Sequence, residues 1–186
     1  MGTVISFEEK AVASLRARVA AAEEANQDLI AFARGHSGAV HSIHEAVLAA
    51  IEAEGFDHLI HIVTQEWPQM LGLDAVAVAL FVGDRGVRAD ASGLQFVEPR
   101  VVERAVDGLE GVVLRGCARG HPLFGPACDL IRAEALVRLD SPAPMPGGML
   151  ALGQREAQGF ETRHGSELLL FLGRVLTRTM ARCLTS

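Results

Sequence analysis

Four histidines form two pairs whose spacing could serve metal binding. His41 and His44 are three residues apart, and His58 and His61 repeat that spacing. Side chains three residues apart lie side by side on a helix, and the imidazole nitrogen is a common zinc and iron ligand. No cysteine or third ligand motif accompanies either pair, and the acidic and amide residues around them are typical of solvated helix surfaces. We therefore expect no bound metal, and these four histidines are the candidates that a metal would use.

Thiol chemistry is a second possibility. The cysteines are Cys117, Cys128 and Cys183, an odd number without a CxxC spacing, which argues against a disulfide framework and a zinc knuckle. A reactive thiol needs a pKa lowered by a cation, a helix N-terminus or a histidine, and Arg119 and His121 lie between the first two cysteines. One interpretation is a redox site at Cys117 and Cys128. The other, which we prefer, is that Cys128 and Cys183 are small core residues.

The sequence contains no further catalytic signature. Ser92 and Ser141 fall in expected loops, but neither has the GxSxG context of a nucleophile elbow. The chain has neither a GxxxxGKS/T phosphate loop nor a GxGxxG run after a strand, so nucleotide hydrolysis and dinucleotide binding lack support. The sequence therefore favours a protein that is not an enzyme, and it predicts no cofactor.

Composition and charge narrow the class of partner. The chain has 186 residues, of which 49% are hydrophobic, enough apolar surface for one compact domain with an appended helix. A net charge of -6 without a basic block disfavours direct nucleic-acid binding. The apolar run 75–82 is far short of the roughly 20 residues that span a bilayer. The N-terminal residues lack a signal-peptide pattern, so we expect a cytoplasmic protein with no membrane segment.

A long helix is predicted near the N-terminus, and its apolar stripe would bind a partner helix. Ser6 with Glu9 is a capping-box pattern, and Gly35 with Gly38 predicts the end of the helix. Between them, a stripe of residues recurs in steps of three and four, as at the a and d positions of a left-handed coiled coil. The expected seam consists of Val12, Leu15, Val19, Ala22, Asn26 and Leu29.

One polar residue and one charged pair indicate how this seam would associate. With Val12 at position a, Asn26 also falls at a, where a buried polar side chain favours one register, most simply that of a parallel dimer. In that dimer Arg18 faces Glu23 of the partner subunit, a pair worth about 0–1 kcal/mol. We favour a homodimer. The alternative left open is that the stripe packs back on its own domain.

The rest of the chain alternates between helical and strand patterns. Helices are expected near 40–55, 57–70, 99–107 and 162–184. Strands are expected at 74–82, 87–91 and 112–115, and in a central hairpin over 133–153. This order predicts an α+β fold, with helices on one face of an antiparallel sheet and loops and short helices on the other.

Five segments carry a resemblance to a known family. They are Val12-Ala-Ser-Leu-Arg-Ala-Arg-Val19, Leu29-Ile-Ala-Phe-Ala-Arg34, Leu123-Phe-Gly125, Ile131-Arg-Ala-Glu-Ala-Leu-Val137 and Leu150-Ala-Leu-Gly153. In their order and spacing they resemble the bacterial DUF484 family of GAF-like proteins over nearly the whole chain. The resemblance implies a dimerisation helix over 1–36, followed by a GAF-like domain over 37–186. It also implies a cytoplasmic, dimerising protein, and none of the matching segments is a catalytic motif.

A GAF-like fold implies a cavity between the sheet and the loop side. The candidates to line it are Phe81, Arg88, Phe96, Leu123, Phe124 and Arg138. Apolar walls with one or two arginines suit a small anionic or amphipathic ligand. The alternative is that these side chains fill the core and that no ligand binds.

The sequence thus favours one function and leaves two others open. The favoured function is a homodimeric, non-catalytic sensory or scaffold module, whose ligand and protein partner the sequence does not identify. The segment Ala127-Cys-Asp129 is similar to the catalytic-cysteine region of GAF-fold free methionine sulfoxide reductases, without the upstream resolving cysteine at their spacing. The alternatives are therefore a thiol-dependent reductase of that type and a ligand-free protein-interaction adapter.

Overall fold

The computed structural model describes residues 7–141, 147–157, 160 and 163–185, except the side chains of 7–11, 28–29, 31–34, 36 and 163–164. The chain divides into two units, Met1–Ala39 and Val40–Ser186, each of which is described by itself. The helices are α1 (Phe7–Ile51), α2 (Phe56–His61), η1 (Ile62–Glu66), α3 (Trp67–Leu71), α4 (Pro99–Val106), η2 (Pro122–Asp129) and α5 (Arg163–Thr185). The strands are β1 (Ala75–Val82), β2 (Arg85–Asp90), β3 (Gly93–Val97), β4 (Val112–Gly116), β5 (Ala133–Leu139) and β6 (Gly148–Gln154).

The first helix is longer than the sequence predicts. α1 runs for 45 residues through Gly35 and Gly38, so the helix end expected at these glycines is wrong. A glycine inside a helix costs about 1 kcal/mol relative to alanine. Ile43 and Val47, which follow soon after, are buried in the core of the second unit, and this burial outweighs the cost of continuing the helix. The predicted capping residue Ser6 lies outside the described residues.

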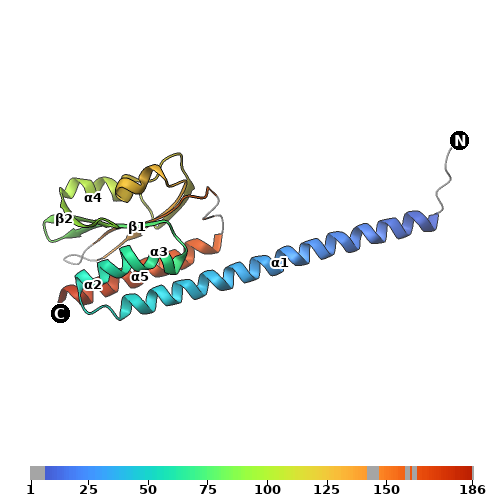
Figure 1. Cartoon of the computed structure of the whole chain (residues 1–186), viewed down its shortest axis with the longest axis horizontal. Coiled ribbons are helices and arrows are strands. Elements are labelled where there is room, and N and C mark those ends of the chain that lie inside the picture. The colour runs from blue at the N-terminus through green and yellow to red at the C-terminus, as the bar shows by residue number, and fades with distance from the viewer. Residues whose placement is uncertain (1–6, 142–146, 158–159, 161–162, 186) are drawn as a thin grey trace. The chain divides into compact units, whose positions relative to one another are not determined.

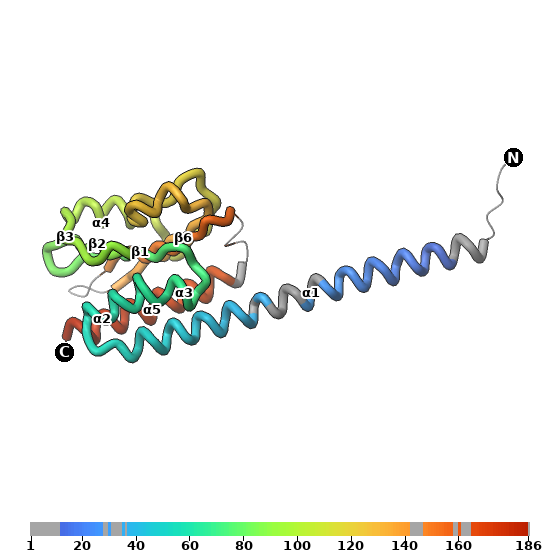
Figure 2. Tube along the Cα trace, in the orientation of Figure 1, coloured from blue at the N-terminus to red at the C-terminus, as the bar shows by residue number. Residues whose placement is uncertain are grey.

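Six strands form one antiparallel sheet in the order β3-β2-β1-β6-β5-β4. The expected hairpin is β5–β6, in which Val137 lies opposite Leu150, and β6 lies beside β1 at the centre. Figures 1 and 2 show the sheet between a layer that contains α2, α3 and α5 and a layer that contains α4. The expected α+β arrangement is confirmed.

The alternation of side chains along the strands separates two apolar layers. Val78 and Leu80 of β1 are buried together with Leu172 of α5. Ala77 and Ala79, which point the other way, are buried together with residues of α4 and η2. The small side chains on this second face allow η2 to pack close to the sheet.

The last turns of α1 belong to the second unit, where side chains of other helices donate hydrogen bonds to backbone carbonyls at and near its end. The buried Trp67 of α3 donates its Nε1–H to the carbonyl of Ala46 at 3.0 Å. Arg182 of α5 donates to the carbonyls of Ile51 and Ala53 at 2.7 and 3.1 Å. An arginine at the C-terminal end of a helix satisfies carbonyls that have no partner inside the helix. These bonds join the end of α1 to α5.

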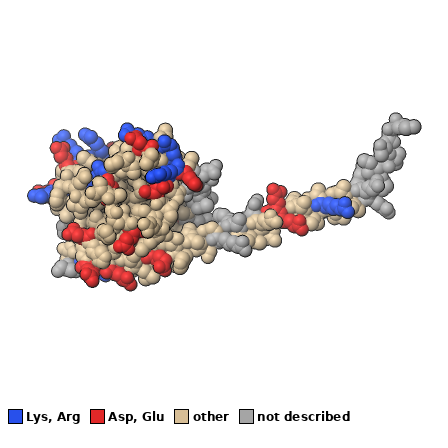
Figure 3. Space-filling view, viewed as in Figure 1, with Lys and Arg blue, Asp and Glu red and all other residues tan. Residues whose placement is uncertain are grey.

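Charged side chains are unevenly spread over the second unit. In Figure 3, acidic side chains dominate the visible lower side, where α1 and α2 lie, and arginines gather at the upper side, near α4. Among the described residues, no helix combines the length and the apolar character that crossing a membrane requires.

Candidate functional site

The first unit exposes the predicted seam of α1. Val12, Leu15 and Val19 are 46, 57 and 55% exposed, and the smaller seam residues up to Asn26 are exposed as well. The remaining seam residue is Leu29, whose side chain lies outside the description. A stripe of large apolar side chains on a helix surface marks a site for another apolar face.

The same heptad repeat continues into the second unit, where it is covered. Counting on from Asn26 (a), the a and d positions include Ile43, Val47 and Ala50, which are 5, 8 and 0% exposed. They are buried in the core cluster that also contains Leu172 of α5. The chain's own core therefore covers the repeat beyond residue 40, while the described seam residues of 12–27 remain exposed.

Three of the predicted cavity residues come together on the loop side of the sheet. Leu123 and Phe124 of η2 are each 2% exposed, and they belong to one apolar cluster with Val102 of α4 and Met149 of β6. Phe81 is half-buried and packs against the same cluster. These side chains form part of a filled core layer.

Arg88 of β2 lies next to this layer, and the chain itself engages its guanidinium group. It forms an ion pair with Asp90, which is 4% exposed. The carboxylate of Asp90 also accepts a hydrogen bond from the backbone N–H of Ser92 at 2.8 Å. Burial raises the pKa of Asp90, but the hydrogen bonds from Ser92 and Arg88 outweigh it and lower that pKa overall.

The chain of η2 bends where it crosses this ion pair. Gly125 has a φ of +56°, a conformation that favours glycine. A Cβ atom at this position would lie 2.7 Å from Oδ2 of Asp90, so the close approach also requires glycine. Beneath the bend, the buried Nε of Arg88 has no hydrogen-bond partner among the described residues. This atom is an open donor on the loop side of the sheet.

The two other predicted cavity residues are placed differently. Arg138 of β5 donates to the carbonyls of Val106 and Leu109 at 3.0 and 3.2 Å, so it closes the C-terminal end of α4. Phe96 is 67% exposed on the edge strand β3, opposite Val87, which is buried in the helix-side layer. The structure therefore does not bring Phe96 together with the other candidates, and backbone contacts occupy Arg138.

A buried carboxylate that the sequence analysis missed fastens the loop with the cysteines. Glu134 of β5 is 0% exposed and lies opposite Arg115 of β4. Its Oε1 accepts from Nε of Arg115 at 2.7 Å, and its Oε2 accepts from the backbone N–H of His121 at 2.6 Å. The one signal in the sequence was a charged residue within the otherwise apolar strand 133–137. Both oxygens are satisfied, so Glu134 ties the loop to the sheet.

His121 depends on the same contacts and begins η2. Its Nδ1 accepts a hydrogen bond from the backbone N–H of Leu123 at 3.2 Å. Burial lowers the pKa of His121, Glu134 raises it and Arg115 lowers it, with a net decrease. The neutral ring is the form that can accept the bond from Leu123, so the buried environment and the cap favour the same protonation state.

The cysteines are not arranged as an activated pair. Burial raises the pKa of Cys117, and the charge of Glu134 adds to that increase. A raised pKa favours the neutral thiol, which is the weak nucleophile. Cys128 is 7% exposed in the loop-side cluster, and the charge of Arg119, which forms an ion pair with Asp129, lies near its thiol. Cys183 of α5 is half-buried against the helix-side core.

The histidine pairs remain on the surface. His41 and His44 are exposed on α1, and His58 and His61 are exposed on α2. Nδ1 of His58 accepts the backbone N–H of Glu54 at 3.3 Å. Within the described part of the chain, no three histidine, cysteine or acidic side chains cluster in a way that could hold a metal ion.

The antiparallel strand order, the helices on one face and the short η2 on the other define a GAF-like domain. The GAF domain of a phosphoenolpyruvate-protein phosphotransferase from Coxiella burnetii is similar with a TM-score of 0.57 at 14% identity, over 80% of this chain and 96% of that one. By its match to the family model over residues 1–184, the chain belongs to the DUF484 family, described as proteins of unknown function. No curated protein matches the sequence.

Two further solved structures show how widely this fold is shared. A bacteriophytochrome from R. palustris is similar with a TM-score of 0.52 at 14% identity, over 76% of this chain and 37% of that one. A free methionine-R-sulfoxide reductase from Neisseria meningitidis, in complex with its substrate, has a TM-score of 0.50 at 15% identity, over 77% and 88%. At such identities the similarity defines the fold alone, because proteins with different functions share it.

Proposed function

We propose that this protein is a homodimeric, non-catalytic GAF-like module with a sensory or scaffold role. The observation that carries the proposal is the seam of α1, where Val12, Leu15 and Val19 are 46, 57 and 55% exposed. Such a stripe is stabilised when a second helix covers it. The heptad spacing favours a second copy of the same helix as that cover.

The polar seam residue selects the arrangement of the two copies. In a parallel pair, Asn26 faces Asn26 of the partner subunit and the two amides can bond to each other, whereas antiparallel pairing sets it against an apolar side chain. Arg18 then lies near Glu23 of the partner subunit, with a contribution of about 0–1 kcal/mol because both side chains are exposed. The pair of Arg18 and Glu23 therefore favours the parallel register but adds little to the affinity of the dimer.

The loop side of the sheet is the place for a sensory function. The open Nε donor of Arg88 and the half-buried Phe81 are both on this side of the sheet, and together they suit a small anionic or amphipathic ligand. Leu123 and Phe124 fill this side, so a ligand enters only when η2 moves, and Gly125 is the point at which η2 can bend. A ligand that binds the opened form would shift the population of the two forms, and a protein partner would read the change. Without a ligand, the same dimer serves as an adapter.

Sedimentation equilibrium of the full chain tests the dimer. We expect a dimer at micromolar concentration, and we expect Leu15→Lys to be monomeric because it places a charge in the apolar seam. Ala17→Lys is the matched control, since it adds the same charge at the outward f position and leaves the mass of the dimer unchanged. A monomeric unmodified chain, or a Leu15→Lys variant that stays dimeric, contradicts the proposal.

A thiol-dependent reductase is the second candidate. The observation in its favour is the Arg119 guanidinium beside the thiol of Cys128, because a cation stabilises a thiolate. The raised pKa of Cys117 argues against a second activated thiol. A reductase would lose all turnover of free methionine sulfoxide in Cys128→Ser. We expect no turnover in the unmodified chain, and measurable turnover would favour the reductase instead.

A further inference from the structure

The two edges of the sheet differ in how they are protected. β4 forms one edge, where it carries Arg115, and its Val112 and Leu114 are half-buried against the helix-side core. β3 forms the other edge, and Figure 2 shows it beyond β2. Residues 93–96 are all exposed, and 93–97 contain no charged side chain. Charged side chains normally keep an edge from pairing with another strand, so β3 is an unprotected edge.

Two apolar side chains of β3 extend the helix-side layer to this edge. Leu94 lies opposite Ala89 and Phe96 opposite Val87, and both of these β2 residues are buried in the helix-side core. Residues directly opposite each other point to the same face of a sheet. Leu94 and Phe96 therefore belong to the same layer, but at the edge they are 37 and 67% exposed. We refer to these two side chains as the apolar strip.

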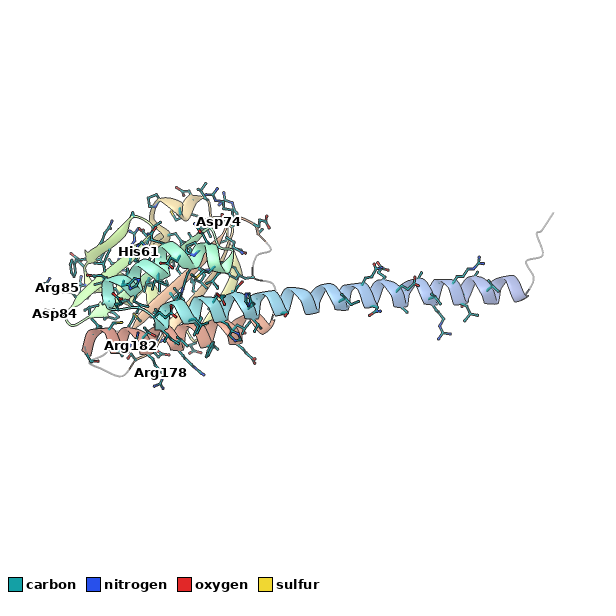
Figure 4. The ribbon with its side chains drawn as sticks, turned by 60° about the horizontal axis from the view of Figure 1, so that its bottom comes forward. His61, Asp74, Asp84, Arg85, Arg178 and Arg182 are labelled. Carbon is teal, nitrogen blue, oxygen red and sulfur yellow. The ribbon has the colours of Figure 1, made fainter. Side chains whose placement is uncertain are left out.

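Arg85 holds the ring of Phe96 in place. Its guanidinium carbon lies 5.6 Å from the centre of the ring, where the ring electrons attract a cation. Figure 4 labels Arg85 next to Asp84, at the turn that joins β1 to β2. Most of the ring surface remains in solvent, so the apolar strip is available to another apolar side chain.

The alternation of backbone hydrogen bonds determines which groups of β3 are free. Along a strand inside a sheet, successive residues bond in turn to the two neighbouring strands. The N–H of Phe81 in β1 donates to the carbonyl of Gly147 at 2.9 Å, on the β6 side, so Leu80 bonds to β2. Leu80 lies opposite Val87. Val87 therefore bonds to β1, and the next residue, Arg88, bonds to β3.

The same alternation leaves the strip residues with outward backbone groups. Arg88 lies opposite Gln95, so Gln95 bonds back to β2. The residues on either side of it, Leu94 and Phe96, point their N–H and C=O groups away from β2. Within the described residues no further strand lies beyond β3, so these four groups face solvent or a partner.

This edge is complementary to a second copy of itself. In an antiparallel pair with Gln95 opposite the partner's Gln95, Leu94 lies opposite the partner's Phe96, and Phe96 lies opposite the partner's Leu94. Each of these two pairs brings outward backbone groups together and can exchange two hydrogen bonds. The side chains of each pair also meet on one face, as an aliphatic and an aromatic neighbour. A twofold contact needs a self-complementary surface, and β3 meets that requirement in its backbone and its side chains.

Charge and size also favour a second copy as the partner. Residues 93–97 bring no charge into the contact, so a pairing of identical chains puts no like charges in direct opposition there. The edge spans five residues, whereas a stable interface takes about 20–30 residues from each partner. The contact is therefore weak, and it forms at higher protein concentration than a dimer held by a larger interface.

We infer that β3 pairs with β3 of a second copy, antiparallel around Gln95, and links dimers into tetramers. The strand contact is separate from the seam of α1, whereas the assembly into tetramers rests on the proposed homodimer. Each chain then has one contact through α1 and another through β3, so two dimers join by a β3 pair. Leu94 and Phe96 are covered in the joined form.

Disulfide trapping at Gln95 tests the strand contact without the seam. Gln95→Cys is placed in the Leu15→Lys full chain, in which a charge disrupts the seam. In the inferred pair the two cysteines lie opposite each other at a position without backbone bonds. The Cα atoms are about 4.5 Å apart at such a position, a distance at which a disulfide can form. We expect a covalent dimer under mild oxidation.

The control is Ser92→Cys in the same Leu15→Lys chain. Ser92 is exposed three residues from the axis, so its two copies lie roughly 20 Å apart in the inferred pair. It should give no more covalent dimer than Leu15→Lys alone, whose three native cysteines set the background. Equal yields from Gln95→Cys and Ser92→Cys, or no dimer of Gln95→Cys above the background, overturn the inference and leave the seam proposal untouched.

A charge on the apolar strip tests the larger assembly. Phe96 is 67% exposed, so Phe96→Lys should fold normally, while its charge opposes the packing of the partner's Leu94. In sedimentation equilibrium at rising concentration, we expect the unmodified chain to pass from dimer to tetramer. Phe96→Lys should weaken this step at least tenfold and leave the dimer unchanged. Leu130→Lys is the control and should form tetramers normally, because it adds the same charge at a leucine that is 50% exposed after η2.

Two outcomes of the sedimentation experiment overturn the inference. They are an unmodified chain that remains a dimer at every concentration, and a tetramer step that Phe96→Lys leaves unchanged. If Leu15→Lys stays dimeric and adding Phe96→Lys makes it monomeric, the seam proposal fails and the strand contact stands.

Discussion

The two halves of α1 carry the same heptad repeat in different surroundings. Over 12–27 the described a and d side chains are exposed, whereas Ile43, Val47 and Ala50 are buried in the core of the second unit. A repeat of apolar positions thus predicts that a helix has a covered face, but not what covers it. In the second half, the core of the same chain covers the a and d side chains. In the first half, we propose that a second copy of the helix covers them.

The largest effect should come from the covered half. Ile43→Ala removes a side chain that is 5% exposed, and such truncations cost about 2–5 kcal/mol. Val19→Ala removes a side chain that is 55% exposed in one protomer, so it should weaken the dimer and leave the unfolding of the second unit unchanged. Urea unfolding measured at several protein concentrations separates the two effects. If Ile43→Ala and Val19→Ala lowered the stability of the second unit equally, the two halves of α1 would not differ in what covers them.

The polar seam residue gives the next largest effect. Asn26→Leu replaces a polar side chain that the proposed dimer would bury at position a by an apolar one, so the association should become tighter. The same change removes the preference for one register, so species larger than the dimer should form. Sedimentation velocity measures both. If Asn26→Leu leaves the affinity and the species distribution unchanged, Asn26 is not in a seam.

The junction between the two halves gives a smaller effect. Gly35 and Gly38 lie inside α1, and a Cβ at either position would meet no atom within 4 Å. Each glycine-to-alanine substitution should therefore stabilise the helix by about 1 kcal/mol. Circular dichroism should show higher helix content and a later thermal melt for the double alanine variant. A loss of helix content would mean that the glycines end the helix.

Lowering the pH should give the smallest effect, a decrease in the stability of the second unit that the seam of α1 does not share. The pKa of His121 lies below its usual 6.5 and that of Asp90 below 3.8, so near these values the folded state binds fewer protons than the unfolded chain. The stability of the second unit should thus be complete above pH 6.5, fall as the pH drops through the lowered pKa of His121, and fall again below 3.8.

A variant isolates the first of these steps. In His121→Asn, the amide oxygen can accept the bond from the N–H of Leu123 without titrating, so the decrease just below pH 6.5 should disappear. The seam residues 12–27 contain no histidine, so dimer affinity should stay constant between neutral pH and pH 5. Urea unfolding and sedimentation over this pH range check the two statements. If the stability of His121→Asn still decreases just below pH 6.5, another titratable group causes the decrease.

Most of the second unit's fold could be predicted because its central strands are short apolar runs bounded by turn residues. The hairpin of β5 and β6 and the division into a helix side and a loop side followed from apolar periodicity and turn residues. The edge strand β3 was missed, because its residues 93–97 are nearly all exposed and the pattern has no buried side to detect. The continuation of α1 through Gly35 was missed because tertiary burial of Ile43 outweighs a local helix-ending signal.

The candidate site was only partly predictable. Leu123, Phe124 and Phe81 come together as expected from their strand and loop positions. Arg138 and Glu134 have roles that depend on partners far away in sequence, the end of α4 and the loop at His121. Periodicity within one element carries no information about such partners, so the sequence alone could not assign them.

Disulfide trapping tests the central claim most directly, because identical a positions face each other in a parallel seam. Val19→Cys in the full chain should give a covalent dimer under mild oxidation, whereas Ala17→Cys at the outward f position should give almost none. The unmodified chain, with Cys117, Cys128 and Cys183, sets the background. Equal yields from both variants, or no dimer above the background from Val19→Cys, would contradict a parallel pairing of α1.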